Sequence, residues 1–255
     1  MIHNNKGGIF LQKLIKFFMT NTLMFSIVSL LTYVFYGVVI GTCMIPSFLF
    51  IRLILNYIDI AQISGIALLA ISVGVAVYIY FITSLIAFGI LERILTIGFK
   101  PGRYKTSSPL FSRWIIYSGL HVILLNTTLP FMTGTVWGKL FYRILGCKLG
   151  KNVFINSKGL HDAYLLEIGD NVVIGGDSNI SCHIFEGDTL ILGKIKIGNN
   201  SLISAESYIM PGVEIGNKCS IGIKAYVRKN KKIEDGSIVM AVPGMDAKKI
   251  AELIK

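Results

Sequence analysis

Three titratable side chains lie within one short stretch, HIFEGD: His183, Glu186 and Asp188. An imidazole has an unperturbed pKa near 6.5, so it can take up and return a proton near neutral pH. The carboxylate of Glu186, or that of Asp188, follows closely enough to orient such an imidazole. The competing interpretation is a solvated loop histidine with no chemistry. The stretch therefore supplies candidates for acid–base chemistry, His183 and Glu186 as catalytic candidates and Asp188 as a candidate substrate contact.

Two other groups of polar residues are candidates for binding. His161 and Asp162 lie in GLHDAYLLE, where a structural turn and a substrate contact are both open interpretations. Near the C-terminus, VRKNKK carries a group of cations that either cap the fold in solvent or contact the phosphates of a bound cofactor or anionic lipid headgroups. The cofactor-binding candidates in that group are Lys229, Lys231 and Lys232.

No metal site is expected from this sequence. Its four cysteines show no CxxC spacing, which disfavours both a thiolate metal site and a disulfide framework. A zinc site of the γ-carbonic-anhydrase kind needs three histidines, and only His161 and His183 lie in the C-terminal half. Nucleic-acid binding is also not expected, because no run of Lys or Arg is interleaved with aromatic residues.

The element that must carry these residues is a repeat with a period of six. An aliphatic residue recurs without a slip at Ile197, Ile203, Ile209, Ile215, Ile221, Val227, Ile233 and Val239, and earlier at Leu149, Ile155, Ile168, Ile174 and Ile180. Neither a helix nor an alternating strand has this period. Three hexads form one 18-residue coil, so the sequence predicts a left-handed parallel β-helix over residues 149–244 whose aliphatic residues stack inward from coil to coil.

Two interruptions of the register locate the candidate residues in this β-helix. The interval from Ile155 to Ile168 is 13 residues, one more than two hexads, which predicts a bulge around His161 and Asp162. The interval from Ile180 to Ile197 is 17 residues, which predicts that the chain leaves the coil around His183. Functional residues are commonly mounted on loops that leave a rigid scaffold.

The N-terminal half has the composition of a membrane protein. Residues 1–149 hold 12 Lys or Arg and 2 acidic residues, a charge of +10, whereas residues 150–255 hold 13 and 12, a charge of +1. Uncharged runs at 23–45 and 63–91 are each long enough to cross a hydrocarbon core of roughly 30 Å. The sequence therefore predicts a transmembrane hairpin in residues 1–93.

The cations that flank this hairpin predict its orientation. Lys6, Lys13 and Lys16 precede the first predicted span, and Arg93 with the cations after it follows the second. The positive-inside rule then places both termini, and with them the β-helix, in the cytoplasm of a multi-pass cell-membrane protein.

Residues 94–148 are expected to form an interfacial or re-entrant amphipathic segment. In this interpretation Trp114, Tyr117 and Trp137 lie near headgroup depth and His121 is an interfacial histidine. A short helix is expected at 245–255.

The C-terminal register resembles that of the hexapeptide-repeat acyltransferases, in which a loop bearing a histidine precedes a Pro-Gly-Val-x-Ile-Gly coil, here residues 211–216. This resemblance implies acyl transfer from a thioester, usually acetyl-CoA, in a groove between the subunits of a homotrimer. The loop histidine of the family corresponds to His183, which would take the proton of an acceptor hydroxyl or amine, while backbone N–H groups would stabilise the oxyanion.

A longer stretch, from about residue 90 to 240, is similar to the membrane-anchored C-terminal region of nonribosomal peptide synthetases of the poly-lysine-synthetase type. The similarity rests on KPGRY, RW, GT, YRILGCKLGKNVFI, DAYLLEIGDNVVIG and HIFEGD, which occur in the same order. Asp162 matches the acidic residue of that family. This resemblance implies an aminoacyl or peptidyl transferase that uses a thioester on a carrier protein.

The chain departs from the acyltransferase pattern at IGIKAYV, where many members have small residues. Ile223, Lys224 and Tyr226 could obstruct a pantetheine arm, which leaves the donor open. The first hypothesis is a membrane-bound acyltransferase that transfers an acyl group from acetyl-CoA or another thioester to a lipid-linked or surface-polymer precursor. The aminoacyl transferase and a non-catalytic trimeric membrane scaffold are the alternatives, and the acceptor itself is not identified by the sequence.

Overall fold

The structure, a computed structural model, describes residues 22–241. They form two compact units. The first comprises the chain up to Gly98 together with Tyr104–Met132, and the second comprises Phe99–Arg103 and the chain from Thr133 onward. Besides the range predicted for the β-helix, the second unit includes a short segment that follows α3 in the chain and the residues from Thr133. The helix predicted at 245–255 lies outside the described residues.

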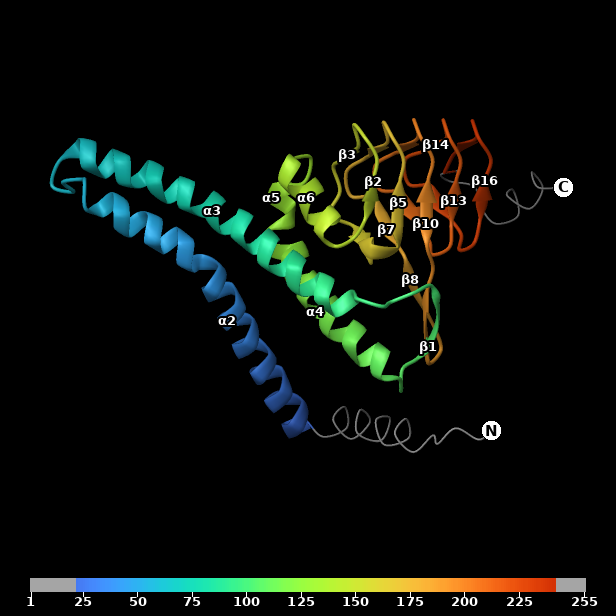
Figure 1. Cartoon of the computed structure of the whole chain (residues 1–255), viewed down its shortest axis with the longest axis horizontal. Helices are drawn as coiled ribbons and strands as arrows, with labels where there is room; N and C mark the ends of the chain where they lie inside the picture. The colour runs from blue at the N-terminus through green and yellow to red at the C-terminus, as the bar shows by residue number, and fades with distance from the viewer. Residues whose placement is uncertain (1–21, 242–255) are drawn as a thin grey trace. The chain divides into compact units, whose positions relative to one another are not determined.

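Two long helices dominate the first unit (Figure 1): α2 spans Thr22–Leu55 and α3 spans Ile63–Thr96. Both contain segments long and apolar enough to cross a membrane, Tyr33–Leu55 and Ile63–Thr96. The sequence predicted that the first span would end at residue 45. The helix instead continues through Pro46 to Leu55, so Arg52 lies in its last turn. One internal proline removes a single backbone hydrogen bond, and the apolar residues that follow it still favour a helix.

Short hydroxyl side chains join α2 to α3. The Ser47 hydroxyl donates to the carbonyl oxygen of Ala76 over 2.7 Å, and the Thr83 hydroxyl donates to that of Cys43 over 2.8 Å. Small polar residues of this kind let apolar helices approach closely and hydrogen-bond to each other's backbone.

The segment predicted to be interfacial or re-entrant contains a regular 19-residue helix, α4, spanning Pro109–Thr127, followed by the short helix α5, Leu129–Met132. Ser108 caps α4, since its side chain accepts a hydrogen bond from the N–H of Phe111 over 3.2 Å. Trp114 and Tyr117 are 4% and 2% exposed, and the headgroup depth expected for them stays a prediction. Trp137 lies in the second unit and is partly exposed.

A buried contact between a histidine and a glutamate connects α3 and α4. Nδ1 of His121 lies 2.9 Å from Oε2 of Glu92, and their side chains are 3% and 0% exposed. His121 is therefore buried against a carboxylate within this helical unit, and its depth in a membrane stays a prediction. A carboxylate buried this deeply is stable only with a polar partner. Glu92 is part of the helix because α3 extends beyond the predicted end of the span, to Thr96.

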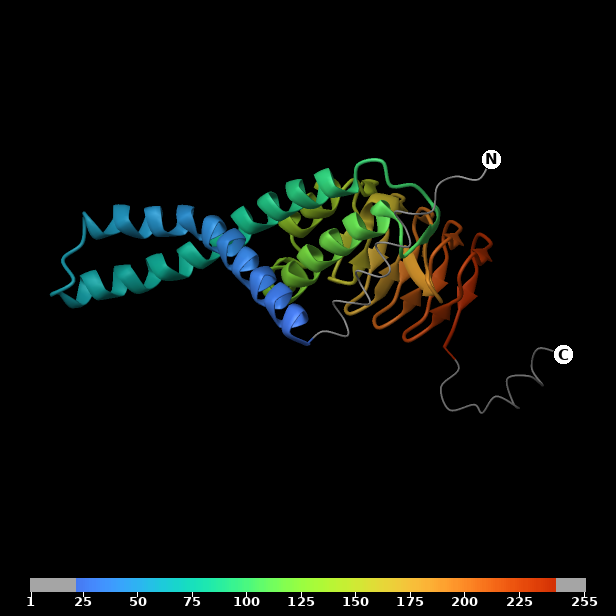
Figure 2. The ribbon, with the colours of Figure 1, turned by 90° about the horizontal axis from the view of Figure 1, so that it is seen from below.

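The second unit is the predicted left-handed parallel β-helix, preceded by helix α6, Val136–Ile144. Its coils stack one on another in Figures 1 and 2. Three parallel sheets form its faces. The first contains β2 (Lys148–Leu149), β5 (Leu166–Ile168), β10 (Ile195–Ile197), β13 (Glu214–Ile215) and β16 (Lys232–Ile233). The second contains β3 (Phe154–Ile155), β6 (Val173–Ile174), β11 (Leu202–Ile203), β14 (Ser220–Ile221) and β17 (Ile238–Val239), and the third β4 (Leu160–His161), β7 (Asn179–Ser181), β12 (Tyr208–Ile209) and β15 (Tyr226–Val227).

The six-residue register corresponds to the buried core of this unit. Residue pairing is in register from coil to coil, for example Ile197 with Ile215 and Ile203 with Ile221. Each predicted core position is at most 3% exposed: Ile174, Ile180, Ile197, Ile203, Ile209, Ile215 and Ile221. The prediction is confirmed, and stacking buries apolar surface that no single coil could bury alone.

The glycines that follow the inward residues are required by close approach of successive coils. A Cβ atom on Gly198 would lie 2.5 Å from the backbone carbonyl carbon of Gly216 in the next coil. No side chain fits at that distance, so the corner needs a residue without one.

Candidate active site

A β-hairpin leaves the coil where the register is interrupted. Its strands are β8, His183–Glu186, and β9, Thr189–Leu192, which pair antiparallel with His183 opposite Leu192. The N–H of Gly193 donates to the carbonyl oxygen of Cys182 over 2.8 Å and closes the base of the hairpin. His183 is therefore held where a hairpin meets a rigid coil. The predicted departure from the coil is present, but it is an ordered hairpin.

Asp162 approaches His183 from the previous coil. Oδ2 of Asp162 lies 2.5 Å from Nδ1 of His183. Asp162 is only 1% exposed, whereas the His183 side chain is 24% exposed. With the proton on Nδ1, the imidazole donates to the carboxylate and keeps the lone pair of Nε2 for a substrate. This is the arrangement of a general base with an orienting carboxylate.

The predicted bulge produces this contact. After β4 the chain turns through a left-handed residue, Asp162 (φ 53°), into the 3₁₀ turn Ala163–Leu165. Asp and Asn adopt this conformation more readily than other residues with a side chain. β4 pairs with β7 so that His161 is opposite Ser181, which brings Asp162 beside the first residue of the hairpin.

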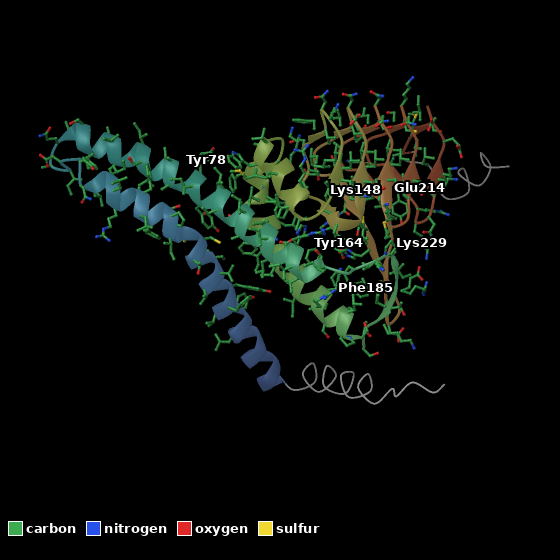
Figure 3. All side chains as sticks on the ribbon, in the orientation of Figure 1. Tyr78, Lys148, Tyr164, Phe185, Glu214 and Lys229 are labelled. Carbon is green, nitrogen blue, oxygen red and sulfur yellow. The ribbon has the colours of Figure 1, made fainter. Side chains whose placement is uncertain are left out.

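Further hydrogen bonds hold both partners. The Tyr164 hydroxyl donates to Oδ1 of Asp162 over 3.1 Å, so each carboxylate oxygen has its own donor. The Ser181 hydroxyl donates to the carbonyl oxygen of His183 over 2.9 Å. Figure 3 labels Tyr164 and Phe185 in this part of the unit. The Phe185 ring contacts that of His183 edge to face, with 6.5 Å between centroids.

A second imidazole lies nearby. The rings of His161 and His183 are 6.1 Å apart, and Nε2 of His161 lies 3.4 Å from the side-chain amide nitrogen of Asn179. The structure therefore brings together His161, Asp162 and His183 from two separate interruptions of the register.

Glu186 does not orient the imidazole. Residues three apart on a strand point to opposite faces, so Glu186 points away from the side chain of His183. Its carboxylate binds Arg103 over 3.4 Å and also contacts the ammonium group of Lys229. The carboxylate that contacts the imidazole is instead that of Asp162. Asp188 is exposed at the hairpin tip, where it accepts a hydrogen bond from Thr189.

The three lysines predicted to bind a cofactor have different surroundings, and their role stays a prediction. Lys229 pairs with Glu186 of the hairpin. Lys232 lies on the first sheet face, 3.9 Å from Glu234. Lys231 is exposed at the turn between them.

The thiol beside His183 is unsuited to covalent catalysis. Cys182 is fully buried, and burial raises the pKa of its thiol well above the ordinary value. Only the thiolate is a good nucleophile, so proton transfer by His183 is the chemistry that this arrangement favours. Among residues 22–241 no group of three or more His, Cys, Asp or Glu side chains could hold a metal ion.

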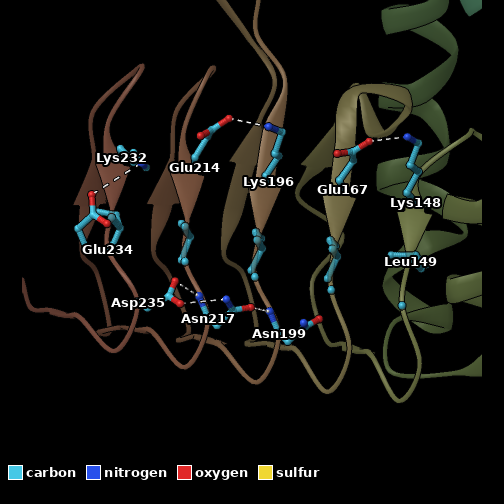
Figure 4. Close-up of a pocket in the computed structure, with 18 residues that line it drawn as sticks. Lys148, Leu149, Glu167, Lys196, Asn199, Glu214, Asn217, Lys232, Glu234 and Asp235 are labelled. Carbon is cyan, nitrogen blue, oxygen red and sulfur yellow. Dashed lines mark hydrogen bonds and ion pairs between the residues drawn. The ribbon is translucent and has the colours of Figure 1, made fainter.

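The first sheet face carries a separate, shallow hollow lined by alternating lysines and glutamates (Figure 4). Hydrogen bonds from Lys148 and Lys194, over 2.6 and 2.7 Å, lower the pKa of the Glu167 carboxyl. Lys196 and Glu214 form a further pair over 2.7 Å. Because these charges neutralise one another, the face is a weaker candidate for a substrate site than the His183 region.

Residues 194–229 match the family of bacterial transferase hexapeptide repeats (six repeats). The delta-poly-L-ornithine synthetase of Acinetobacter baumannii is 23% identical over 158 residues, which are 60% of this chain and 12% of that protein. The chain thus spans about an eighth of the length of this relative. The match confirms the resemblance to enzymes that join amino acids into a polymer.

Two solved structures are also similar to this chain, at lower sequence identity. A maltose O-acetyltransferase from Clostridium difficile has 21% identity and a TM-score of 0.43, with 56% of this chain and 89% of that chain covered. A serine acetyltransferase from Entamoeba histolytica has 14% identity and a TM-score of 0.25, covering 72% and 70%.

Proposed function

We propose that this protein is a membrane-bound acyltransferase that moves an acyl group from a thioester to a hydroxyl or amine of a lipid-linked or surface-polymer precursor. The observation that carries the proposal is the contact between His183 and the buried carboxylate of Asp162 at the base of the hairpin. The match of the coils to transferase hexapeptide repeats supports the reaction class.

In the proposed reaction, Nε2 of His183 removes the proton of the acceptor hydroxyl or amine. The acceptor atom bonds to the thioester carbonyl carbon, the carbon–sulfur bond breaks, and the thiolate leaves. The imidazolium returns the proton to that thiolate. Asp162 keeps the tautomer and stabilises the imidazolium, and His161 is close enough to contact the substrate.

The test compares purified full-length protein with His183→Ala, using acetyl-CoA as donor, a membrane lipid extract as acceptor, and release of the CoA thiol as the measurement. Loss of roughly 10²–10⁴ in kcat is expected for a general base. A His183→Ala variant that retains full activity would refute the proposal.

The donor has a second candidate because of the resemblance to poly-ornithine synthetase. Ile223 and Tyr226 are 62% and 58% exposed on the coil where acyltransferases usually have small residues, and they could obstruct a pantetheine arm. An aminoacyl thioester on a carrier protein is therefore the alternative donor. Transfer from such a carrier but not from acetyl-CoA would favour it.

A homotrimer is part of the proposal. The outward side chains of the second sheet form an apolar row, with Phe154 paired to Val173 and Val173 to Leu202. These three side chains are 39–46% exposed, and exposed apolar rows of this kind commonly mark an interface. Native mass spectrometry in detergent should give three chains, and Leu202→Glu should give monomers.

We also propose a cytoplasmic β-helix, on the charge of the segments that flank the two apolar helices. Labelling of a cysteine placed at Lys158 tests it, since a membrane-impermeant reagent added outside should not react there.

A further inference from the structure

The segment Phe99–Arg103, here called the strap, follows α3 after two residues but belongs to the unit that contains the β-helix. It consists of Phe99 and the first four residues of the KPGRY stretch. Its last two residues begin strand β1, Gly102–Lys105, which lies next to β9 of the hairpin in the sheet order. The strap makes two contacts near His183, one to the residue that holds Asp162 and one to the hairpin.

The first contact supports Asp162. The ring of Phe99 stacks on that of Tyr164 with 5.7 Å between centroids and 27° between planes, and Phe99 is 7% exposed. The Tyr164 hydroxyl in turn donates to Oδ1 of Asp162. A carboxylate that is 1% exposed has little water to orient it, so its donors decide which oxygen faces His183.

The second contact supports the hairpin. Arg103 binds Glu186 at the end of β8, the strand that begins with His183. This pair is weaker, because the Arg103 side chain is 64% exposed and Glu186 also binds Lys229. Exposed ion pairs contribute little by themselves. The aromatic contact is therefore the main one.

We propose that Phe99 and Tyr164 are positioning residues for the acid–base pair, with Arg103 as a minor contributor. This inference rests on the proposed function, in which His183 is the base. It means that the site is completed by a segment next to a membrane-type helix and not by the β-helix alone.

The test measures the reactivity of His183 directly and needs no substrate. Diethyl pyrocarbonate modifies neutral imidazole, and mass spectrometry of the His183 peptide gives the rate in the detergent-purified full chain. In Tyr164→Phe the carboxylate loses a donor and holds a proton on the imidazole more strongly. The pH profile should move to higher pH, with modification about threefold slower at pH 6.

Two further variants and a control distinguish a positioning role from an unspecific effect of substitution on the fold. Phe99→Ala should move the pH profile in the same direction. Phe99→Tyr keeps a ring that can stack on Tyr164, so this variant should have the parental profile. Tyr208→Phe removes a hydroxyl from a half-exposed tyrosine of the same unit and should leave the profile unchanged.

The outcomes distinguish the two proposals. If Tyr164→Phe and Phe99→Ala keep the parental profile, the strap does not position the pair and this inference is wrong. If Phe99→Ala fails to fold, Tyr164→Phe alone decides the matter. An active His183→Ala protein would instead refute the proposed function, whatever the modification rates are.

Discussion

Replacing Asp162 by asparagine tests the acid–base pair with almost no change in size. The amide cannot accept a charge-assisted hydrogen bond from Nδ1 of His183, which lies 2.5 Å from Oδ2 in the parent. If the amide oxygen keeps its bond to the Tyr164 hydroxyl, the NH₂ group faces the imidazole and favours the tautomer with its proton on Nε2. That tautomer has no lone pair for the acceptor.

The size of the effect follows from the lost bond. Hydrogen bonds to charged groups contribute about 1.5–3 kcal/mol, and each ~1.4 kcal/mol changes a rate tenfold. Asp162→Asn should therefore lower kcat by about 10- to 150-fold at neutral pH, less than or similar to His183→Ala. Because the two residues act together, the double variant should lose little more than His183→Ala does.

The assay is release of CoA thiol from acetyl-CoA by the detergent-purified full chain with the lipid-extract acceptor. The matched control is Asp177→Asn, since Asp177 is exposed on the turn between β6 and β7, has no role in the site and should keep parental activity. An Asp162→Asn protein within twofold of the parent, alongside an inactive His183→Ala protein, would refute the orienting role.

Three other predictions concern stability, measured by thermal unfolding. Glu92→Leu removes the carboxylate that His121 contacts and should lower the free energy of unfolding by about 3–5 kcal/mol. Changing both Glu92 and His121 to leucine should recover most of that stability. A Glu92→Leu protein as stable as the parent would contradict this prediction. The pKa of Glu167 is lowered in the folded protein from its ordinary value near 4.5. The ionised carboxylate therefore stabilises the fold above that value, and this contribution is lost as the pH falls through the lower folded pKa. Glu167→Gln should make stability depend less on pH on the acid side, and a profile like that of the parent would contradict the prediction. Gly198→Ala should destabilise by about 1–3 kcal/mol because its Cβ overlaps the next coil, whereas Gly176→Ala, whose nearest neighbour would be 3.6 Å away, should be tolerated.

The sequence determined the β-helix because the buried positions repeat at a fixed interval. Each coil buries one aliphatic residue per face against the same residue of the next coil, so the core appears as a six-residue period that needs no knowledge of distant contacts. The same register located both interruptions, and with them the regions of Asp162 and His183. Long uncharged runs likewise revealed α2 and α3, since length and composition decide whether a helix can cross a membrane.

The ends of the helices were less predictable. The predicted spans end before Pro46 and before Glu92, yet α2 continues through Pro46 and α3 includes Glu92. A carboxylate can lie inside an apolar helix pair when a neighbouring helix supplies a partner, and α4 supplies His121. That partner is 29 residues away and leaves no local signal.

Only the tertiary structure decided which carboxylate orients His183. By spacing, Glu186 was nearer in sequence, but strand alternation turns it to the opposite face of the hairpin. Asp162, 21 residues earlier, reaches His183 because β4 and β7 are stacked in register and the extra residue of the bulge turns the chain toward the hairpin. The contact of Phe99 with Tyr164 has the same origin, since a fold brings together side chains whose separation along the chain carries no periodicity.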